Sequence, residues 1–513
     1  MSKNYYITTP IYYPSAKPHM GHAYSSIIAD FFSRFKKIDG YNVYFLTGTD
    51  EHGLKIQRAA EKKGVDTLKF CDEISQTFRD LSKTLNLTNT DFIRTTEERH
   101  KLSVKNLWKE LKKNDEIYLS KYSGWYSVSD EAFYSEDEIE DIDGKKRAVS
   151  SKSSVEWLDE ESYFFRLSKW EKPLLKYYKD NPNFISPESR KNEVISFVKN
   201  GLKDLSISRK SFSWGIQVPD DKDHVIYVWL DALTNYISAL NYPNTDDQLF
   251  KQFWPATTHL IGKDILRFHA VYWPAFLLAA NISLPKTVYG HGWILSGEEK
   301  MSKSKGNILD PIEIINQYGL DPLRYYLIKE VSFGNDGNIS QERLEDCINS
   351  DLANNYGNLC QRVITFAIKN CDSKIPDKIE FKKDDLKILD NFESNLDLIR
   401  DKIDEHDLNF YINFIVNSLF EANKYFNDQE PWKKKDDLLR LNTIVYTTLE
   451  IVRKISFLLY PIIPSSSLKA LKIFDILEKD IVLDSIINNE FLAKNKKINS
   501  IDILFKKIEK KDD

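Results

Sequence analysis

The segment that decides the fold spans residues 5–53 and reads YYITTPIYYPSAKPHMGHAYSSIIADFFSRFKKIDGYNVYFLTGTDEHG. Its start, Tyr5–Thr8, is aromatic and β-branched, which favours a buried strand. Apolar residues then recur at three- and four-residue steps from Tyr24 to Ile38, the spacing of one helix face. A second strand-like run, Val43–Leu46, leads into the loop Thr47–Gly53. Strand, helix and strand in this order predict a parallel sheet of the nucleotide-binding kind.

The remainder of the chain completes this sheet and adds a second domain. Strand-like runs at Val225–Trp229, His259–Ile261 and Thr287–Tyr289 predict its later strands, and residues 115–223 are interpreted as an insertion with short aromatic strands. From Asp351 onward the pattern is helical with few glycines. The predicted fold class is therefore α/β: a Rossmann-like parallel sheet split by a connective insertion and followed by an α-helical bundle. The predicted boundaries are 1–114 and 224–295 for the two halves of the sheet domain, 115–223 for the insertion, 296–350 for a loop region and 351–513 for the bundle.

Composition excludes several protein classes. Of the 513 residues, 42 % are hydrophobic and 29 % are charged, a balance unlike that of a disordered chain. No apolar run approaches the ~18 residues of a membrane helix, so no membrane partner is expected. The formal net charge is −5, so a nucleic acid would need a local basic surface.

The cysteines indicate a reducing compartment. Cys71, Cys347, Cys360 and Cys371 are widely spaced and form no C-x-x-C pair, which excludes a disulfide framework and a cysteine-based zinc knuckle. The first residues also lack the basic and apolar regions of a secretory signal. A cytoplasmic protein is therefore expected.

The first candidate site is His19-Met20-Gly21-His22, between the first strand and the helix. Two imidazoles three residues apart share one side of the first helical turn, where free backbone N–H groups favour an anion. Gly21 would let a flat nucleobase approach the backbone. A plain helix start with two surface histidines remains an alternative, as does a metal pair, for which no third ligand is evident.

The second candidate is the loop Lys300-Met301-Ser302-Lys303-Ser304-Lys305-Gly306-Asn307. Such a loop can fold over a triphosphate and neutralise charge on leaving pyrophosphate. Alternatively it is an ordinary exposed basic loop. No Walker A pattern accompanies it.

Taken together, the two motifs resemble one known class. The first resembles the HIGH signature and Lys300–Ser304 spells KMSKS, so the chain is identified as a member of the class I aminoacyl-tRNA synthetases. The resemblance implies ATP as substrate, Mg²⁺ with the nucleotide, and a catalytic role for His19, His22, Lys300 and Lys303. It implies ATP contacts from His19, Met20, Gly21, His22, Asp264, Ile294, Lys300, Met301, Ser302, Lys303 and Ser304.

Further segments resemble the methionyl-tRNA synthetase family, among them Thr8–Tyr13, Thr47–Gly53, Trp229–Ala232 and Gly262–Ile265. Asp50 would pair with the ammonium group of the amino acid. Aromatic walls with one hydroxyl donor suit a polarisable, weakly accepting thioether. The resemblance implies a methionine site made of Ile11, Tyr13, Asp50, Trp229, Ala232, Leu233, Tyr236, Ile265, His269 and Trp273.

Two departures from the family pattern matter. Many members carry cysteine zinc knuckles in the insertion, but residues 115–223 contain no cysteine, so no structural zinc is expected. Leu233 stands where some members have proline, which leaves the local turn open. The insertion is also too short for the hydrolytic domain of roughly 200 residues found in leucine, isoleucine and valine enzymes, which apolar discrimination alone cannot replace.

The helical bundle offers a candidate tRNA-binding surface. Asn358 and Arg362 lie one helical turn apart, and Trp432 follows later. By resemblance these three read the CAU anticodon, for which an indole face and a guanidinium are chemically apt; burial of Trp432 in the bundle is the alternative. The expected partners are L-methionine, ATP and tRNA(Met), including the initiator tRNA, with the protein a monomer. Another class I synthetase and a catalytically idle tRNA-binding paralogue remain the alternative functions.

Overall fold

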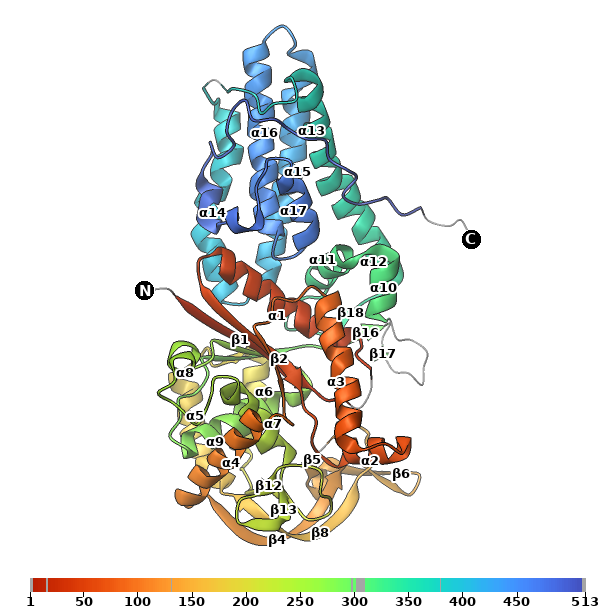
Figure 1. Ribbon diagram of the computed structural model, residues 1–513, viewed down its shortest axis with the longest axis vertical. Coiled ribbons are helices and arrows are strands. Elements are labelled where there is room, and N and C mark those ends of the chain that lie inside the picture. The colour runs from red at the N-terminus through yellow and green to blue at the C-terminus, as the bar shows by residue number, and fades with distance from the viewer. Residues whose placement is uncertain are drawn as a thin grey trace. The chain divides into compact units, whose positions relative to one another are not determined.

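The computed structural model describes residues 3–14, 17–130, 132–296, 299–300, 310–378 and 380–509 (Figure 1). The chain divides into two compact units. Unit 1 contains residues 1–3, 19–42 and 292–513, and unit 2 contains residues 4–18 and 43–291. The helix that follows the first strand therefore belongs to the same unit as the C-terminal helices. The domain boundaries predicted above stay a proposal.

Unit 2 is built on a six-stranded sheet in the order β3-β2-β1-β14-β15-β9. Strand β14 pairs in parallel with both β1 and β15, as expected for a doubly wound sheet. The predicted fold class is confirmed. The strands of the sheet are β1 (Asn4–Tyr12), β2 (Asn42–Thr49), β3 (Asp91–Arg94), β14 (Thr258–Gly262), β15 (Thr287–His291) and β9 (Ile185–Ser186). Its helices are α2 (Leu54–Lys63), α3 (Thr67–Thr84), α4 (Glu98–Lys113), α5 (Glu171–Asp180), α6 (Glu188–Lys199), α7 (Val228–Ser238), α8 (Gln248–Phe253) and α9 (Trp273–Ala279).

The prediction of a strand of the main sheet at Val225–Trp229 is wrong in two respects: the strand ends before Val228, and it belongs to a different sheet. Strand β13 (Asp221–Ile226) pairs antiparallel with β11 (Ser208–Arg209) and β12 (Gln217–Val218) in a separate small sheet. From Val228 the chain forms helix α7, which is buried over almost its whole length. A short apolar run has the same appearance in a buried strand and in a buried helix, so periodicity cannot distinguish them here.

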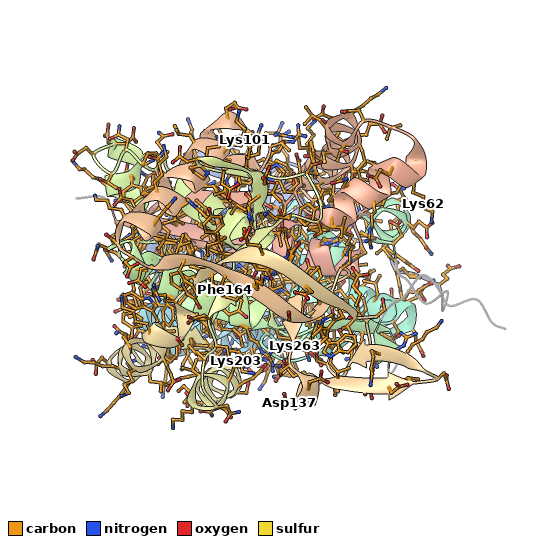
Figure 2. All side chains as sticks on the ribbon, turned by 90° about the horizontal axis from the view of Figure 1, so that it is seen from below. Lys62, Lys101, Asp137, Phe164, Lys203 and Lys263 are labelled. Atoms are coloured by element: carbon orange, nitrogen blue, oxygen red, sulfur yellow. The ribbon has the colours of Figure 1, made fainter. Side chains whose placement is uncertain are left out.

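The insertion carries a long antiparallel pair of strands. Strand β4 (Ile117–Ser127) pairs with β8 (Glu156–Phe165) along nearly its full length, flanked by β10 (Leu205–Ser206) and β5 (Ala132–Tyr134). Figure 2 shows Phe164 on this sheet and Asp137 beside the hairpin of β6 (Ile139–Ile142) and β7 (Lys145–Ala148). The insertion also supplies β9 to the main sheet, where it pairs with β15.

A carboxylate organises the turn after β4. The Asp130 carboxylate accepts hydrogen bonds from the hydroxyls of Tyr134 (2.7 Å), Ser151 (2.5 Å) and Ser153. Burial opposes ionisation, but these hydrogen bonds hold the pKa of Asp130 below its ordinary value. The turn is thus held together by hydrogen bonds between side chains.

Unit 1 contains the helical bundle, in which α16 is the central helix. Helix α16 contacts α13, α14, α15 and α17, and nearly every one of its residues is buried (Figure 1). The bundle helices are α13 (Asn358–Asn370), α14 (Lys383–Asp404), α15 (Leu408–Gln429), α16 (Leu438–Leu459) and α17 (Pro464–Lys472). The other elements of this unit are α1 (Met20–Ile38), α10 (Pro311–Tyr318), α11 (Leu320–Glu330), α12 (Gln341–Cys347), the π-helix Ile348–Gly357, and strands β16 (Ile294–Ser296), β17 (Glu299–Lys300) and β18 (Gly337–Asn338).

Helix α1 is anchored within unit 1 by buried charges. Asp30 accepts hydrogen bonds from Arg34 Nε (2.8 Å) and pairs with Arg324 Nη2 of α11 (2.7 Å), and all three side chains are buried. Arg34 also donates to the Tyr460 hydroxyl (3.1 Å). Because a buried charge without its partner is costly, this network makes the packing of α1 specific to residues far along the chain.

No helix within the described ranges combines the length and the apolar character needed to cross a bilayer.

Candidate active site

The two histidines of the first motif cap the start of α1. His19 is the N-cap residue: its Nδ1 accepts the Gly21 N–H (3.1 Å), while its own backbone N–H donates to His22 Nδ1 (3.1 Å). The two rings stack with centroids 3.8 Å apart. Since both Nδ1 atoms accept, the neutral rings carry their protons on Nε2. The turn therefore presents two stacked imidazoles with Nε2–H donors at a helix N-terminus, an arrangement suited to an anion.

Gly21 lies close to the His19 ring. A Cβ added at this position would lie 3.0 Å from His19 Cε1. Burial, followed by the nearby His19 ring, holds the pKa of His22 well below its ordinary value, so His22 is a neutral donor at pH 7.

The second motif is only partly described. Ile294 is buried in β16, a strand that packs against α1, and the backbone of Lys300 pairs with Leu295 in the β16–β17 ladder. Of the other residues predicted to contact ATP, Met301, Ser302, Lys303 and Ser304 lie outside the described residues. Asp264 is exposed in unit 2, in the turn Lys263–Ile265 that follows β14. A Cβ at Gly262 would lie 2.6 Å from Asp264 Oδ1, so the glycine makes room for this carboxylate.

Most of the predicted methionine residues converge on one apolar cluster in unit 2. Tyr236 of α7 lies with its ring centroid 5.6 Å from His269 and 6.1 Å from Trp273. Trp229, in the first turn of α7, lies with its ring centroid 6.3 Å from that of His269. Leu233 belongs to the same hydrophobic core, and the partly buried Ile11, Tyr13 and Ile265 pack against it. Ala232 is buried beside Leu233 in α7. We call Trp229, Tyr236, Phe268, His269 and Trp273 the aromatic cluster.

The hydrogen bonds of His269 fix its tautomer. Its Nδ1 lies 3.0 Å from the Ile265 carbonyl oxygen, which can only accept, so Nδ1 carries the proton. Burial lowers the pKa of His269 to about 4, which leaves the ring neutral and Nε2 an acceptor. The Tyr236 hydroxyl, 2.6 Å away, therefore donates to Nε2. The hydroxyl that could serve a thioether thus donates its proton to His269 in this state.

These buried histidines should make stability depend on pH. His406 in unit 1 resembles His269 in that burial lowers its pKa to about 4. In the unfolded chain the pKa of a histidine is ~6.5. Between this pH and about pH 4, the unfolded chain therefore binds protons that the folded chain does not bind. The free energy of unfolding is therefore expected to be fully retained above about pH 6.5 and to fall as the pH drops toward 4.

Urea unfolding at pH 7 and pH 5 measures this dependence. His406→Asn, which removes one titrating ring, should weaken the dependence relative to the unaltered protein. Equal unfolding free energies at both pH values would contradict the expectation.

Phe268 belongs to the cluster but was not among the predicted residues. Its ring stacks on Trp229 with centroids 3.7 Å apart and planes 6° from parallel. Its position in the sequence next to His269 was the available signal. The π-helical turn Phe268–Tyr272 places both side chains near Trp229, which a regular helical spacing does not suggest.

Asp50 lies at the C-terminal end of β2. Its side chain is buried, and its backbone N–H donates to the Tyr12 carbonyl (2.9 Å). The Tyr13 hydroxyl donates to the His52 carbonyl (3.1 Å), which ties the end of β1 to the same loop. The predicted ammonium-binding carboxylate is thus brought to the carboxyl edge of the sheet, where such folds bind ligands.

Two of the three candidate anticodon residues, Arg362 and Trp432, line a pocket of about 380 Å³ in the bundle. Trp432 is 41 % exposed and packs edge-on against Phe426. Arg362 lies over the Phe426 ring and donates to Asn427 Oδ1 (2.6 Å). Asn358 is exposed one turn before Arg362 on α13, outside the pocket lining. The alternative of a buried Trp432 is therefore wrong.

Among the residues that the structure describes, no group of three or more histidine, cysteine, aspartate or glutamate side chains is arranged to hold a metal ion.

Known proteins resemble the chain over its whole length. The family described as "tRNA synthetases class I (M)" matches residues 5–145 and 141–364. The family described as "Anticodon binding domain of methionyl tRNA ligase" matches residues 375–513. The methionine–tRNA ligase of Brucella suis biovar 1 is 49 % identical over 472 residues, covering 92 % of each chain. That of Rickettsia felis is 47 % identical over 517 residues, covering 99 % of each chain.

The chain belongs to the methionyl-tRNA synthetase family. A solved structure of Mycobacterium tuberculosis methionyl-tRNA synthetase in complex with methionyl-adenylate matches it with a TM-score of 0.95 and 44 % identity, covering 98 % of this chain and 99 % of that one. The reaction is that of a methionine–tRNA ligase, a class I aminoacyl-tRNA synthetase: L-methionine is activated with ATP to methionyl-adenylate and transferred to the 3′ end of tRNA(Met). The predicted family and reaction are confirmed.

Proposed function

We propose that the aromatic cluster of unit 2 binds the methionine side chain and that Asp50 binds its ammonium group. The observation that carries this assignment is the neutral, hydrogen-bonded Tyr236–His269 pair beside Trp229 and Trp273. A polarisable thioether gains from aromatic contacts and needs little hydrogen bonding, so a neutral apolar lining suits it. Ile11, Tyr13, Ala232, Leu233 and Ile265 complete the lining.

ATP is proposed to bind at the first and second motifs. The Nε2–H groups of His19 and His22 donate to phosphate oxygens. Gly21 lies beneath adenine, with Met20 and Ile294 nearby. Asp264 holds the ribose. Mg²⁺ would arrive with the nucleotide and would supply positive charge beside the phosphates. Lys300 and Lys303, with Met301, Ser302 and Ser304, stabilise the pentavalent phosphate and the departing pyrophosphate.

The chemistry then needs no enzyme nucleophile. The methionine carboxylate attacks the α-phosphate in line, forming the acyl phosphate bond as the bond to pyrophosphate breaks. A ribose hydroxyl of the terminal tRNA adenosine next attacks the activated carbonyl and AMP leaves. Catalysis on this account is positioning together with charge stabilisation.

The pocket beside Trp432 is proposed to bind the CAU anticodon of tRNA(Met), including the initiator tRNA. An indole that is partly exposed offers a face for stacking, and the guanidinium of Arg362 and the amide of Asn358 offer groups for base edges. We further propose a cytoplasmic monomer. The four unpaired thiols support a reducing compartment.

A panel of amino acids in ATP–pyrophosphate exchange tests the assignment of the aromatic cluster. Methionine should support exchange far better than leucine, isoleucine, valine or cysteine. Equal exchange with a branched aliphatic amino acid would contradict it, and sedimentation of the purified protein tests the monomer.

A further inference from the structure

We propose that Glu51 and His52 are positioning residues that hold Asp50 in place, and that Asp231 of α7 is the carboxylate that anchors His52. The inference rests on the proposed function, in which Asp50 binds the ammonium group of methionine. Glu51 and His52 directly follow Asp50 in the loop 50–53, and each is held by its own anchor.

The first anchor is the fully buried carboxylate of Glu51. Arg94 donates to it twice, from Nε to Oε1 (2.7 Å) and from Nη2 to Oε2 (3.0 Å). The hydroxyls of Thr49 (2.7 Å) and Thr96 (2.5 Å) donate to the same two oxygens. Paired bonds between a guanidinium and a carboxylate fix orientation as well as distance. Glu51 is thereby joined to the end of β3.

The second anchor is a buried carboxylate between two imidazoles. His52 Nδ1 donates to Asp231 Oδ2 (2.6 Å), and His100 Nε2 donates to Asp231 Oδ1 (2.7 Å). Burial alone would raise the pKa of Asp231, but attraction to His52 and the two hydrogen bonds hold it below its ordinary value. Asp231 is therefore ionised, and it joins the loop to α7 and α4.

The backbone of the loop is bonded as completely as these side chains. The Glu51 N–H donates to Thr95 Oγ1 (2.8 Å), and its carbonyl accepts the Trp214 indole N–H (2.6 Å). The Gly53 N–H donates to the Trp214 carbonyl (3.2 Å). Together with the bonds from Asp50 N–H to Tyr12 and from the Tyr13 hydroxyl to His52, every residue of the loop has at least one fixed backbone contact.

These contacts separate the role of Asp50 from that of its neighbours. Both oxygens of Glu51 and both of Asp231 already accept strong hydrogen bonds, and both side chains are fully buried. Because protein donors already engage every oxygen of these two carboxylates, neither is the group that receives the substrate ammonium. What they supply is preorganisation: a charged group joined to two fixed neighbouring residues needs little reordering when its ligand arrives.

The test compares L-methionine with its desamino analogue, 4-(methylsulfanyl)butanoate, which keeps the thioether and the carboxylate but has no ammonium group. The ratio of their dissociation constants, measured on the full-length enzyme by competition in equilibrium binding, reports the ammonium contact. Asp50→Asn should lower the preference for methionine by at least about a hundredfold, because it removes one partner of a charge pair. Glu51→Gln and Asp231→Asn should each lower it by about tenfold through misplacement of Asp50.

Matched variants distinguish positioning from a general loss of stability. Tyr44→Phe removes hydrogen bonds to Asp91 (3.1 Å) and to the Ala239 carbonyl (3.0 Å) in the same unit without touching the loop, and it should leave the ratio unchanged. His52→Asn keeps an N–H donor toward Asp231 and should retain most of the preference, whereas His52→Leu should lose it. If Asp231→Asn does not fold, this His52 pair decides the question.

The outcomes are distinguishable. An unchanged ratio in Asp50→Asn overturns the proposed ammonium contact itself. A lowered ratio in Asp50→Asn with unchanged ratios in Glu51→Gln, Asp231→Asn and His52→Leu overturns only the positioning role. An equal fall in Tyr44→Phe also overturns it, since the effect would then follow from lost stability.

Discussion

Lys303→Ala is expected to slow methionyl-adenylate formation by about two to three orders of magnitude, the usual cost of one preorganised donor to a developing charge. The lysine is assigned to the phosphates that separate as pyrophosphate leaves, so its contribution is greatest in the transition state. The KM for methionine should change little, because the aromatic cluster and Asp50 are untouched. Single-turnover adenylate formation, measured by rapid quench, gives the rate directly.

Lys305→Ala is the matched control, since it removes the same charge from the same loop just outside the KMSKS letters. Its rate should stay within a few fold of the unaltered enzyme. Near-normal ATP–pyrophosphate exchange in Lys303→Ala, or an equal loss in both variants, would contradict the assigned role and point to a general electrostatic effect of the loop.

The second large effect is expected at the proposed anticodon site, the pocket beside Trp432. Trp432→Ala should lower kcat/KM for tRNA by up to about a hundredfold, because stacking of one base on an aromatic ring is worth ~1–3 kcal/mol. Methionine-dependent pyrophosphate exchange should be unchanged, since that reaction needs no tRNA. Aminoacylation and exchange assays on the same preparation measure both.

Phe420→Ala controls for loss of an exposed aromatic ring from the bundle. Phe420 is 62 % exposed on α15 and does not line the pocket beside Trp432. Charging by this variant should be near normal. If Trp432→Ala lowers exchange and charging together, the anticodon assignment is wrong or the bundle has lost its structure.

The sequence predicts most strands of the main sheet and the helices of the bundle. The strand-helix-strand order of residues 5–46, the strands near His259 and Val288, and the helices beyond residue 351 all appear in the structure. The error at Val228–Ser238 has a physical cause. Helix α7 is buried on all sides, so its apolar run carries no periodicity that could separate it from a strand.

The candidate site was accessible to sequence analysis only where a motif existed. The HMGH turn, the Tyr236–His269 pair and Trp273 were named by resemblance, and the structure adds the reason for their chemistry in the tautomers of three histidines. Whether each named residue binds its assigned substrate stays a prediction.

The supporting contacts could not be found in the same way. Asp231 lies 179 residues from His52 and 131 from His100, and no spacing rule joins residues so far apart. Phe268 was missed for a related reason, because its approach to Trp229 depends on a local π-helical turn. Such pairings follow from tertiary packing, which a single sequence does not encode as a local pattern.

The anchoring of helix α1 bears on how the chain is made. This helix leaves the ribosome before its partners Arg324 and Tyr460, which are translated hundreds of residues later. At roughly 5–20 residues per second, the helix waits on the order of tens of seconds before Asp30 can meet Arg324 and Arg34 can meet Tyr460. During that interval Phe31 and Phe35 lack their later contact with Tyr411, so we expect the aromatic face of α1 to need shielding until the bundle has been synthesised.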